Sequence, residues 1–306
     1  MNFMTYMKNE VQQLKDIPAL IYIMGGARSG STILEILLSN NPDIFGAGEM
    51  THLIEDVCLA NKICSCGSSC SECDVWSGVF YQKSKIVNNA LYLSENSKKY
   101  DRHKGLIRRY GFGQINKSLQ AHNQFSWEVV DTINAQENTR TVVDSSKYAS
   151  RAMNLFDCRK NGIAVICLTR SAAGMIDSFS KKNKGEQAPK SFLSAAMYIF
   201  SVNLSFWLAR RKFGDRCLLI KFETLMQDPE SVLAKISAWS KISVENSRNI
   251  LKANGSFDVG HIVTGNRLRS ESNIKFNASK ISIGRSYNHF ERAIIKMLDL
   301  FRPIEK

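Results

Sequence analysis

The chain has few of the residues that build linkers. Only five of its 306 residues are prolines, and it has no Pro-rich or Gly/Ser-rich tract and no internal repeat. Hydrophobic residues make up 44% of the chain and charged residues 23%, which is typical of a globular protein and argues against disorder. We therefore expect one large α/β domain, or one such domain with an appended helical subdomain.

Long apolar runs are also missing. Residues 1–16 have no apolar core long enough for a signal peptide, and we judge that no later segment approaches a membrane span. These patterns predict a soluble, cytoplasmic protein without a membrane span.

Acidic residues are scarce relative to basic ones. The chain has 28 Asp and Glu against 41 Lys and Arg, a formal net charge of +13. This excess favours anionic ligands such as a nucleotide, an acidic polymer or a membrane face, although it would also arise from an evenly spread solubility charge. No long basic block or RNA-recognition signature accompanies it, so we do not expect nucleic-acid binding.

Residues 21–32 form the most informative pattern, IYIMGGARSGST. An apolar strand runs into a Gly/Ser/Thr turn and then into a helical pattern over residues 33–38. Unpaired backbone N–H groups at such a helix start bind phosphate or sulfate, and Arg28 adds a cation. A nucleotide-hydrolysing P-loop would carry a lysine before Ser31, but this position is Gly30.

The rest of the chain predicts a parallel sheet flanked by helices. Short apolar runs that precede polar turns predict strands at 20–24, 141–143, 164–169 and 217–221. Residues 75–137 are helix-like and predict an inserted helical cap over the strand ends, and further helices are expected at 189–211 and 288–301. Residues 255–285, rich in Gly, Ser, Asn and Arg, predict a functional loop.

Several motifs together resemble one family. Residues 25–32 resemble the 5′-phosphosulfate loop of sulfotransferases that use 3′-phosphoadenosine 5′-phosphosulfate (PAPS), whose common form includes R-S-G-[ST]-T. The strand 164–170, with Ser178 eight positions after Arg170, is similar to the second signature of that family. Segments 41–49, 144–147 and 260–267 are similar to parts of bacterial members related to the tyrosine-protein and carbohydrate sulfotransferases.

The resemblance implies a fold and a donor. It implies a single sulfotransferase domain over 1–306, with a P-loop-type parallel sheet flanked by helices and a helical insertion capping the acceptor site. Its parts would be 18–74 (phosphosulfate loop and Cys-rich segment), 75–138 (insert) and 139–306 (3′-phosphate-binding half and C-terminal lid). PAPS would bind through two sets of residues: the loop residues Gly26, Ala27, Arg28, Ser29, Gly30, Ser31 and Thr32, and for the 3′-phosphate Arg170, Ser178, Arg267 and Arg269.

The resemblance also suggests catalytic residues. Lys147 would stabilise the transferring sulfuryl group, and Glu49 would be the general base that takes the acceptor's proton. The alternatives are a solvated Lys147 behind a helix capped by Ser145 or Ser146, a Glu49 that only stabilises a helix start, and His52 as the base, since cytosolic members use His. No metal is needed for this chemistry.

Four of the eight cysteines cluster as Cys64, Cys66, Cys70 and Cys73. A C-x-C…C-x-x-C array can bind structural zinc, but ten residues for four ligands is tighter than in zinc ribbons, so zinc, a disulfide and free thiols all remain open. Similar segments occur in some bacterial members of the family. The other four histidines, His103, His122, His261 and His289, are interpreted as packed or surface residues.

We interpret the chain as a PAPS-dependent sulfotransferase that modifies a hydroxyl or amine of a carbohydrate or small natural product. Two alternatives are a P-loop kinase of a small metabolite, which should carry the absent lysine, and a non-catalytic binder of an anionic polymer. The sequence does not identify the acceptor or the oligomeric state.

Overall fold

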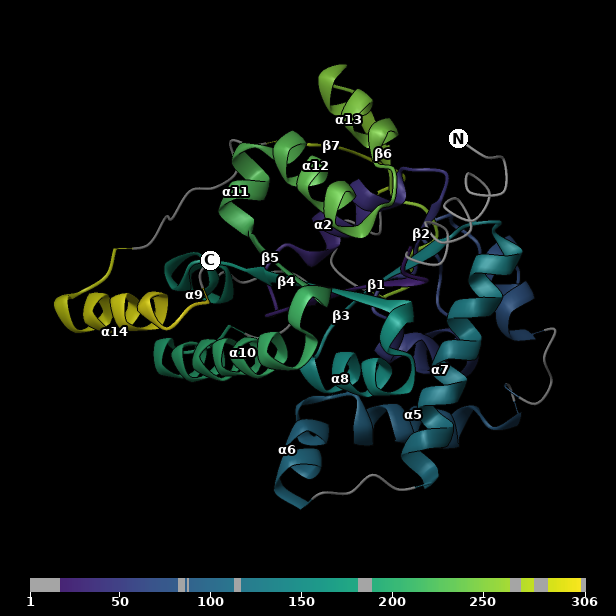
Figure 1. The fold of residues 1–306 in the computed structure, drawn as a ribbon, viewed down its shortest axis with the longest axis horizontal. Coiled ribbons are helices and arrows are strands. Elements are labelled where there is room, and N and C mark those ends of the chain that lie inside the picture. Colours follow the sequence, from purple (N-terminus) through teal and green to yellow (C-terminus); the bar gives the residue numbers. More distant parts are fainter. Residues whose placement is uncertain are drawn as a thin grey trace, which may run out of the picture.

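A five-stranded parallel sheet lies between two layers of helices (Figure 1). The computed structural model describes residues 17–81, 86, 88–112, 117–180, 189–264, 271–277 and 286–303. The strand order is β2-β3-β1-β4-β5, and the strands are β1 (Leu20–Gly25), β2 (Ile44–Gly46), β3 (Thr141–Lys147), β4 (Ile163–Thr169) and β5 (Cys217–Lys221). The predicted α/β class and the four predicted strands are confirmed.

The two faces of the sheet are covered by different helices. Alternate residues of β1 point to opposite faces, so that Tyr22 packs in one core and Ile21 and Ile23 in the other. The first core contains side chains of α7 (Lys117–Gln136), α8 (Ala149–Cys158) and α10 (Phe192–Phe213). The second contains those of α2 (Ser31–Ser39), α11 (Phe222–Gln227) and α12 (Pro229–Ser240), and α13 (Glu245–Lys252) lies beyond α12 (Figure 1). A third cluster joins α10 to α9 (Ala172–Ser180) and α14 (His289–Leu300).

The described residues between 74 and 136 are mostly helical, as predicted for residues 75–137, whereas the Cys-rich residues 60–73 form turns and one isolated β-bridge. The segment between β2 and β3 contains short turns η1 (Met50–His52), η2 (Ile54–Leu59), α3 (Asp74–Trp76) and η3 (Ser77–Tyr81), followed by α5 (Ala90–Tyr100), α6 (His103–Phe112) and α7. Helices α5 and α6 lie below α8 in Figure 1, so the insert extends from one face of the sheet. Two further turns, η4 (Lys160–Gly162) and η5 (Gly214–Arg216), precede β4 and β5.

One local expectation and one of the alternatives are wrong. Residues 255–285 are not all loop, because β6 (Ser256–Asp258) and β7 (Asn273–Lys275) pair as an antiparallel ladder. Strand β3 continues through Lys147, and α8 begins at Ala149, so neither Ser145 nor Ser146 caps that helix. The strand continues because both serine hydroxyls are buried and donate hydrogen bonds to acidic side chains in the core, Ser145 to Glu35 and Ser146 to Asp144.

One helix qualifies the expectation that no segment approaches a membrane span. Within the described residues, Phe192–Arg216 is long and apolar enough to cross a membrane, with a mean hydropathy of 1.5 and 39% of that window buried. Part of this apolar composition serves packing, because α10 contributes side chains to two cores. The same helix also exposes the apolar side chains of Leu193, Met197, Phe200, Leu204 and Trp207. One such helix is only a weak indication of a membrane span.

Candidate active site

The loop after β1 leaves the start of α2 open. Two residues of the loop have left-handed backbones, Arg28 with φ of 67° and Gly30 with φ of 92°. A Cβ atom on Gly30 would lie 2.3 Å from the Phe222 ring, so both conformation and space require glycine here. In the part of the chain that the structure describes, no side-chain cap bonds the first turn of this nine-residue helix, whose N–H groups are therefore available to an anion.

Two side chains from other elements hold this loop in place. The Tyr198 hydroxyl on α10 accepts a hydrogen bond from the Ala27 N–H at 2.7 Å. Arg170, directly after β4, donates from Nη1 to the Arg28 carbonyl at 2.6 Å, and its guanidinium lies 4.4 Å from the centre of the Phe222 ring. Nothing in the sequence pattern of α10 singled out Tyr198, because aromatic side chains in a long helix usually pack in the core.

The Ser29 side chain suits an oxyanion ligand. Its Oγ is buried, and it has no hydrogen-bond partner among the described residues. A buried hydroxyl without a partner is costly, and a phosphate or sulfate oxygen in the loop would satisfy it. The loop therefore suits a phosphate or sulfate group.

The structure brings Glu49 and Lys147 together as an ion pair. Lys147 ends β3 and lies opposite Met24 in the register with β1, one residue before the loop starts. The two side chains are 18% and 16% exposed, and Lys147 has a left-handed backbone with φ of 75°. A lysine holds such a conformation only where its surroundings enforce it, which is common at functional sites.

His52 is less suited to act as a base. His52 is the last residue of η1, which begins directly after Glu49. Its Nδ1 lies 3.3 Å from Nη2 of Arg102. Because a guanidinium only donates, Nδ1 accepts this bond and the hydrogen of the neutral ring lies on Nε2. Burial also lowers the pKa of His52, so the imidazole is neutral and its basic nitrogen is already occupied.

Glu35 fixes the backbone next to Glu49. No sequence pattern identified this residue. This fully buried carboxylate on α2 accepts hydrogen bonds from the Gly48 N–H and, at 2.7 Å, from the Ser145 hydroxyl. It therefore ties together the residue before Glu49 and strand β3. Burial raises the pKa of Glu35 to about 7. The hydrogen bonds from Ser145 and Gly48 lower the pKa, but by less than burial raises it.

We expect Glu35→Gln to weaken the pH dependence of stability. The folded protein holds a proton on Glu35 up to about pH 7, whereas the unfolded chain releases it near 4.5. Between these values the folded state binds more protons, so stability falls as pH rises, by up to about 3 kcal/mol. Gln keeps the shape without titrating. Urea unfolding at about pH 5 and pH 7 should show a shallower decline in the variant, and equal declines would contradict this role.

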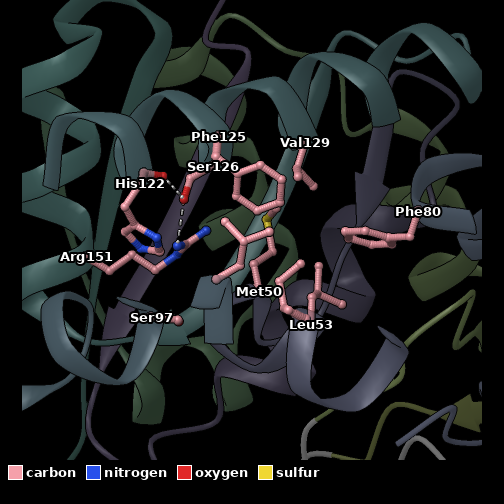
Figure 2. A pocket seen from close by; sticks show the side chains of 11 residues that line it. Met50, Leu53, Phe80, Ser97, His122, Phe125, Ser126, Val129 and Arg151 are labelled. Atoms are coloured by element: carbon pink, nitrogen blue, oxygen red, sulfur yellow. Dashed lines mark hydrogen bonds between the residues drawn. The ribbon is translucent and has the colours of Figure 1, made fainter. Parts of the chain in front are cut away.

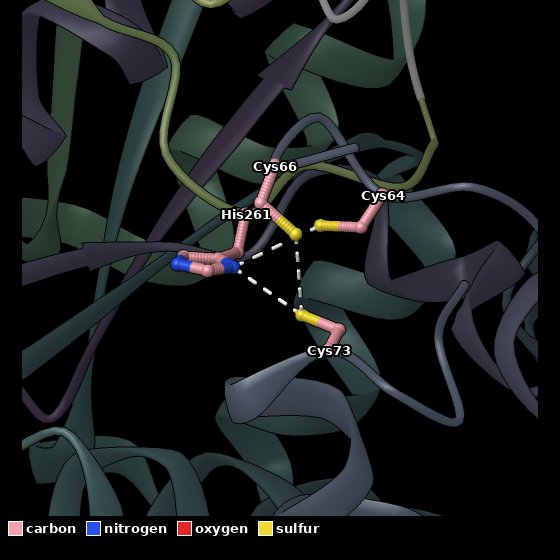
Figure 3. A group of neighbouring side chains, drawn as sticks. All are labelled: Cys64, Cys66, Cys73 and His261. Carbon is pink, nitrogen blue, oxygen red and sulfur yellow. Dashed lines mark hydrogen bonds between the residues drawn. The ribbon is translucent and has the colours of Figure 1, made fainter. Parts of the chain in front are cut away.

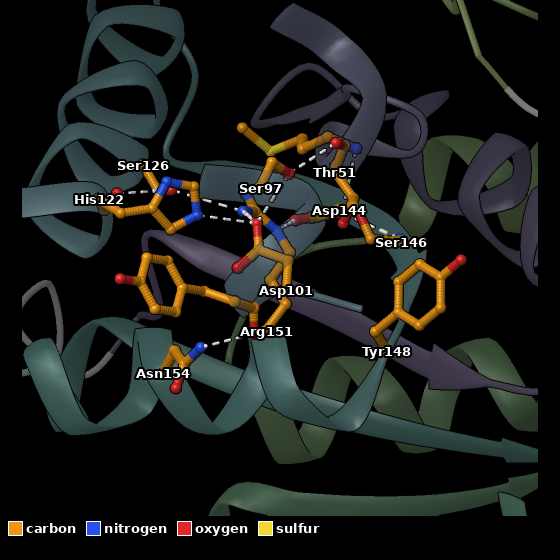
Figure 4. A network of polar contacts seen from close by, with 12 residues as sticks. Thr51, Ser97, Asp101, His122, Ser126, Asp144, Ser146, Tyr148, Arg151 and Asn154 are labelled. Atoms are coloured by element: carbon orange, nitrogen blue, oxygen red, sulfur yellow. Dashed lines mark hydrogen bonds and ion pairs between the residues drawn. The ribbon is translucent and has the colours of Figure 1, made fainter. Parts of the chain in front are cut away.

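A buried polar network lies beneath the site (Figure 4). Arg151 on α8 donates to Asp144 of β3 and to Asp101 after α5, both at 2.8 Å, and His122 of α7 lies 3.0 Å from Asp101. Burial alone would raise the pKa of Asp101, but the charges and hydrogen bonds of His122 and Arg151 lower it to about 2. The expectation that His122 is a packed histidine is therefore confirmed.

The same network fixes the segment that carries Glu49. The Thr51 N–H donates to the Ser146 hydroxyl at 2.9 Å, and the Ser97 hydroxyl donates to the Thr51 carbonyl at 2.7 Å. The Met50 N–H donates to Asp144 at 3.3 Å. Buried side chains thus hold the backbone next to both Glu49 and Lys147.

A small cavity lies beside this network in the insert (Figure 2). Its walls include Met50, Leu53, Phe125, His122 and Arg151. The volume of about 20 Å³ is enough for about one water molecule. An acceptor substrate therefore does not bind in this cavity.

The 3′-phosphate residues are only partly described. Ser178 is half-buried on α9, which begins two residues after Arg170. Arg267 and Arg269 lie outside the described residues. The assignment of these four residues to one phosphate stays a prediction.

The cysteine cluster differs from the predicted set. The Sγ atoms of Cys64, Cys66 and Cys73 converge with an imidazole nitrogen of His261, whereas Cys70, which is buried like Cys64 and Cys73, is not part of this group. The structure therefore groups His261, and not Cys70, with the other three cysteines, and whether any of them binds zinc stays a prediction. The physical reason is that β6 ends next to the Cys-rich segment, which spacing in the sequence does not reveal.

No protein-family model matches the chain, and no curated protein sequence matches it. Among solved structures, the chain is similar to the sulfotransferase domain from the curacin biosynthetic pathway, with a TM-score of 0.51 and 18% identity over 92% of this chain and 98% of that one. The sulfotransferase domain of the Synechococcus PCC 7002 olefin synthase matches with a TM-score of 0.45 and 16% identity over 92% and 94% of the two chains. Sulfotransferase STF9 from Mycobacterium avium matches with 0.46 and 11% over 81% and 72%. The first likeness shows that the chain has the fold of a sulfotransferase domain.

Proposed function

We propose that this protein transfers a sulfuryl group from PAPS to a hydroxyl or amine of an acceptor and releases adenosine 3′,5′-bisphosphate. One observation carries the proposal. The Gly/Ser/Thr loop after β1, Glu49 after β2 and Lys147 at the end of β3 meet at the carboxyl edge of the sheet, where Glu49 and Lys147 form an ion pair. Ligands bind at this edge in parallel α/β sheets.

Each part of the site has a chemical role in this reaction. PAPS supplies an activated sulfuryl group, and in-line transfer places negative charge on its equatorial oxygens and on the leaving phosphate. The loop N–H groups and Lys147 stabilise that charge, since they lie at the same strand ends. Glu49 takes the proton of the attacking acceptor, and in the free protein its charge is neutralised by Lys147.

Arg170 gives the proposal a specific test. We assign it, with Ser178, to the 3′-phosphate, because a guanidinium has five N–H donors and the bond to Arg28 uses one of them. Loss of a charged hydrogen bond costs about 1.5–3 kcal/mol, so Arg170→Met should weaken binding of adenosine 3′,5′-bisphosphate by roughly 10- to 100-fold. Binding of 5′-AMP, which lacks the 3′-phosphate, should change much less in calorimetric titrations.

The control for this test is Arg159→Met, which removes an exposed guanidinium paired with Asp131 and should leave both affinities unchanged. Equal weakening of the two nucleotides by Arg170→Met would mean that Arg170 only supports the loop. That result would remove the proposed 3′-phosphate contact.

We place the acceptor between the phosphosulfate loop and helix α6. The ring of His103, at the start of α6, lies 4.9 Å from that of Tyr148 and 6.1 Å from that of Tyr198. Tyr148 follows Lys147 directly, and Tyr198 bonds the loop, so the insert reaches the reacting groups. Aromatic side chains at this position suit a sugar or a small natural product.

A further inference from the structure

Four metal-binding side chains from two distant segments meet next to the insert (Figure 3). Cys64, Cys66 and Cys73 come from the Cys-rich segment before α3, and His261 comes from the segment after β6. The three Sγ atoms and one imidazole nitrogen all lie within 4.8 Å of one another. In Figure 3 all four side chains point toward a common centre.

The distances between these atoms match a tetrahedral zinc site. Sγ of Cys66 and Sγ of Cys73 are 3.8 Å apart, and Nδ1 of His261 lies 3.3 Å from Sγ of Cys73 and 3.9 Å from Sγ of Cys64. Zn–S bonds of about 2.3 Å and Zn–N bonds of about 2.0–2.1 Å in a tetrahedron give edges of roughly 3.8 Å for S···S and roughly 3.6 Å for S···N. A disulfide would instead need about 2.05 Å between sulfurs.

Neighbouring groups hold the ligands in this arrangement. Trp76 donates from Nε1 to the His261 carbonyl at 2.9 Å. The Ser65 N–H donates to the Ile262 carbonyl at 3.1 Å, and the Ile262 N–H donates to the Ser65 hydroxyl at 2.8 Å. Such supporting hydrogen bonds, which orient ligands before metal binds, are typical of metal sites.

We propose that Cys64, Cys66, Cys73 and His261 bind one structural Zn²⁺ ion. Thiolates and an imidazole suit zinc and not magnesium or calcium, and four protein ligands leave no open position for catalysis. Binding releases the three thiol protons to solvent and leaves a complex with a net charge of −1. This site goes beyond the proposed function and does not depend on it.

Zinc would hold residues 260–264, which follow β6, next to the active site. The Thr264 hydroxyl, three residues after His261, bonds to the Asp56 carboxylate in η2. Gly48 lies close to this segment, because a Cβ atom on it would come within 3.0 Å of the Thr264 carbonyl oxygen. Metal at the cluster therefore holds residues 260–264 against the backbone that carries Glu49.

The test is the metal content of the purified full-length chain, expressed with zinc and measured by mass spectrometry of the elements. We expect one zinc per chain in the wild-type protein and loss of most of it in Cys73→Ser and His261→Asn. The matched control is Cys70→Ala, which removes a cysteine of the same segment that is outside the cluster and should keep the zinc. Circular dichroism checks that each variant is folded.

A second measurement guards against variants that fail to fold. Wild-type protein reloaded with Co²⁺ should show thiolate-to-cobalt charge transfer and the intense visible bands of a tetrahedral site. A strong chelator should also lower its melting temperature, because metal that binds only the folded state stabilises it. Wild-type protein without zinc and without these cobalt bands would overturn the proposal, as would loss of zinc in Cys70→Ala but not in His261→Asn.

Discussion

We expect Glu49→Gln to lower the rate of the proposed sulfuryl transfer by roughly 10²- to 10⁴-fold, the usual contribution of a general base. Gln has nearly the same size but does not accept a proton at neutral pH. Affinity for adenosine 3′,5′-bisphosphate should stay within a few-fold, because Glu49 lies at the Lys147 side of the site and not in the loop. The measurement compares turnover with nucleotide titration of the same preparation.

Two further variants test whether this loss is specific to Glu49. Glu230→Gln neutralises an exposed carboxylate of α12 that pairs with Arg248, and it should not change turnover. His52→Asn should slow the reaction less than Glu49→Gln does, since Nδ1 of His52 is occupied by Arg102. A larger loss in His52→Asn would make histidine the base, and a collapse of nucleotide affinity in Glu49→Gln would make Glu49 a binding residue.

The second large effect is on stability. Arg151→Met should lower the free energy of unfolding by about 3–5 kcal/mol, because it leaves Asp101 and Asp144 as buried carboxylates without their cation. Exposed ion pairs contribute at most about 1 kcal/mol. Arg140→Met, which removes a guanidinium 3.9 Å from the exposed Asp43, is the matched control.

Urea unfolding at neutral pH measures both variants. If Arg151→Met destabilises the protein no more than Arg140→Met does, the buried network does not hold the Glu49 segment in place. Turnover of the Arg151→Met protein that remains folded should also fall, because Thr51 and Met50 depend on the same network.

The sequence was sufficient for most of the sheet. Four strands were predicted because each is a short apolar run that ends in polar residues, and β2 was missed because three residues are too short to show a pattern. The shared location of the loop and Lys147 also followed from position, since each comes after a predicted strand, whereas Glu49 was assigned from the family resemblance and its pairing with Lys147 is seen only in the structure.

The missed residues act across long sequence separations. Glu35 stands in the apolar run of α2, and its partners Gly48 and Ser145 are 13 and 110 positions away. His261 lies 188 positions from Cys73, so ligand spacing within the Cys-rich segment favoured Cys70 in its place. Local sequence patterns do not reveal such contacts, because the packing of helices and strands determines them.

The most direct measurement of the central claim is a thermal-shift titration with adenosine 3′,5′-bisphosphate, with 5′-AMP and ATP plus Mg²⁺ as comparators. A ligand at 100 times its Kd stabilises the folded state by about 2.7 kcal/mol. The account predicts a large rise in melting temperature with the bisphosphate and smaller rises with the other two nucleotides. No rise with the bisphosphate, or a larger one with ATP and Mg²⁺, would contradict the sulfotransferase proposal and favour a kinase.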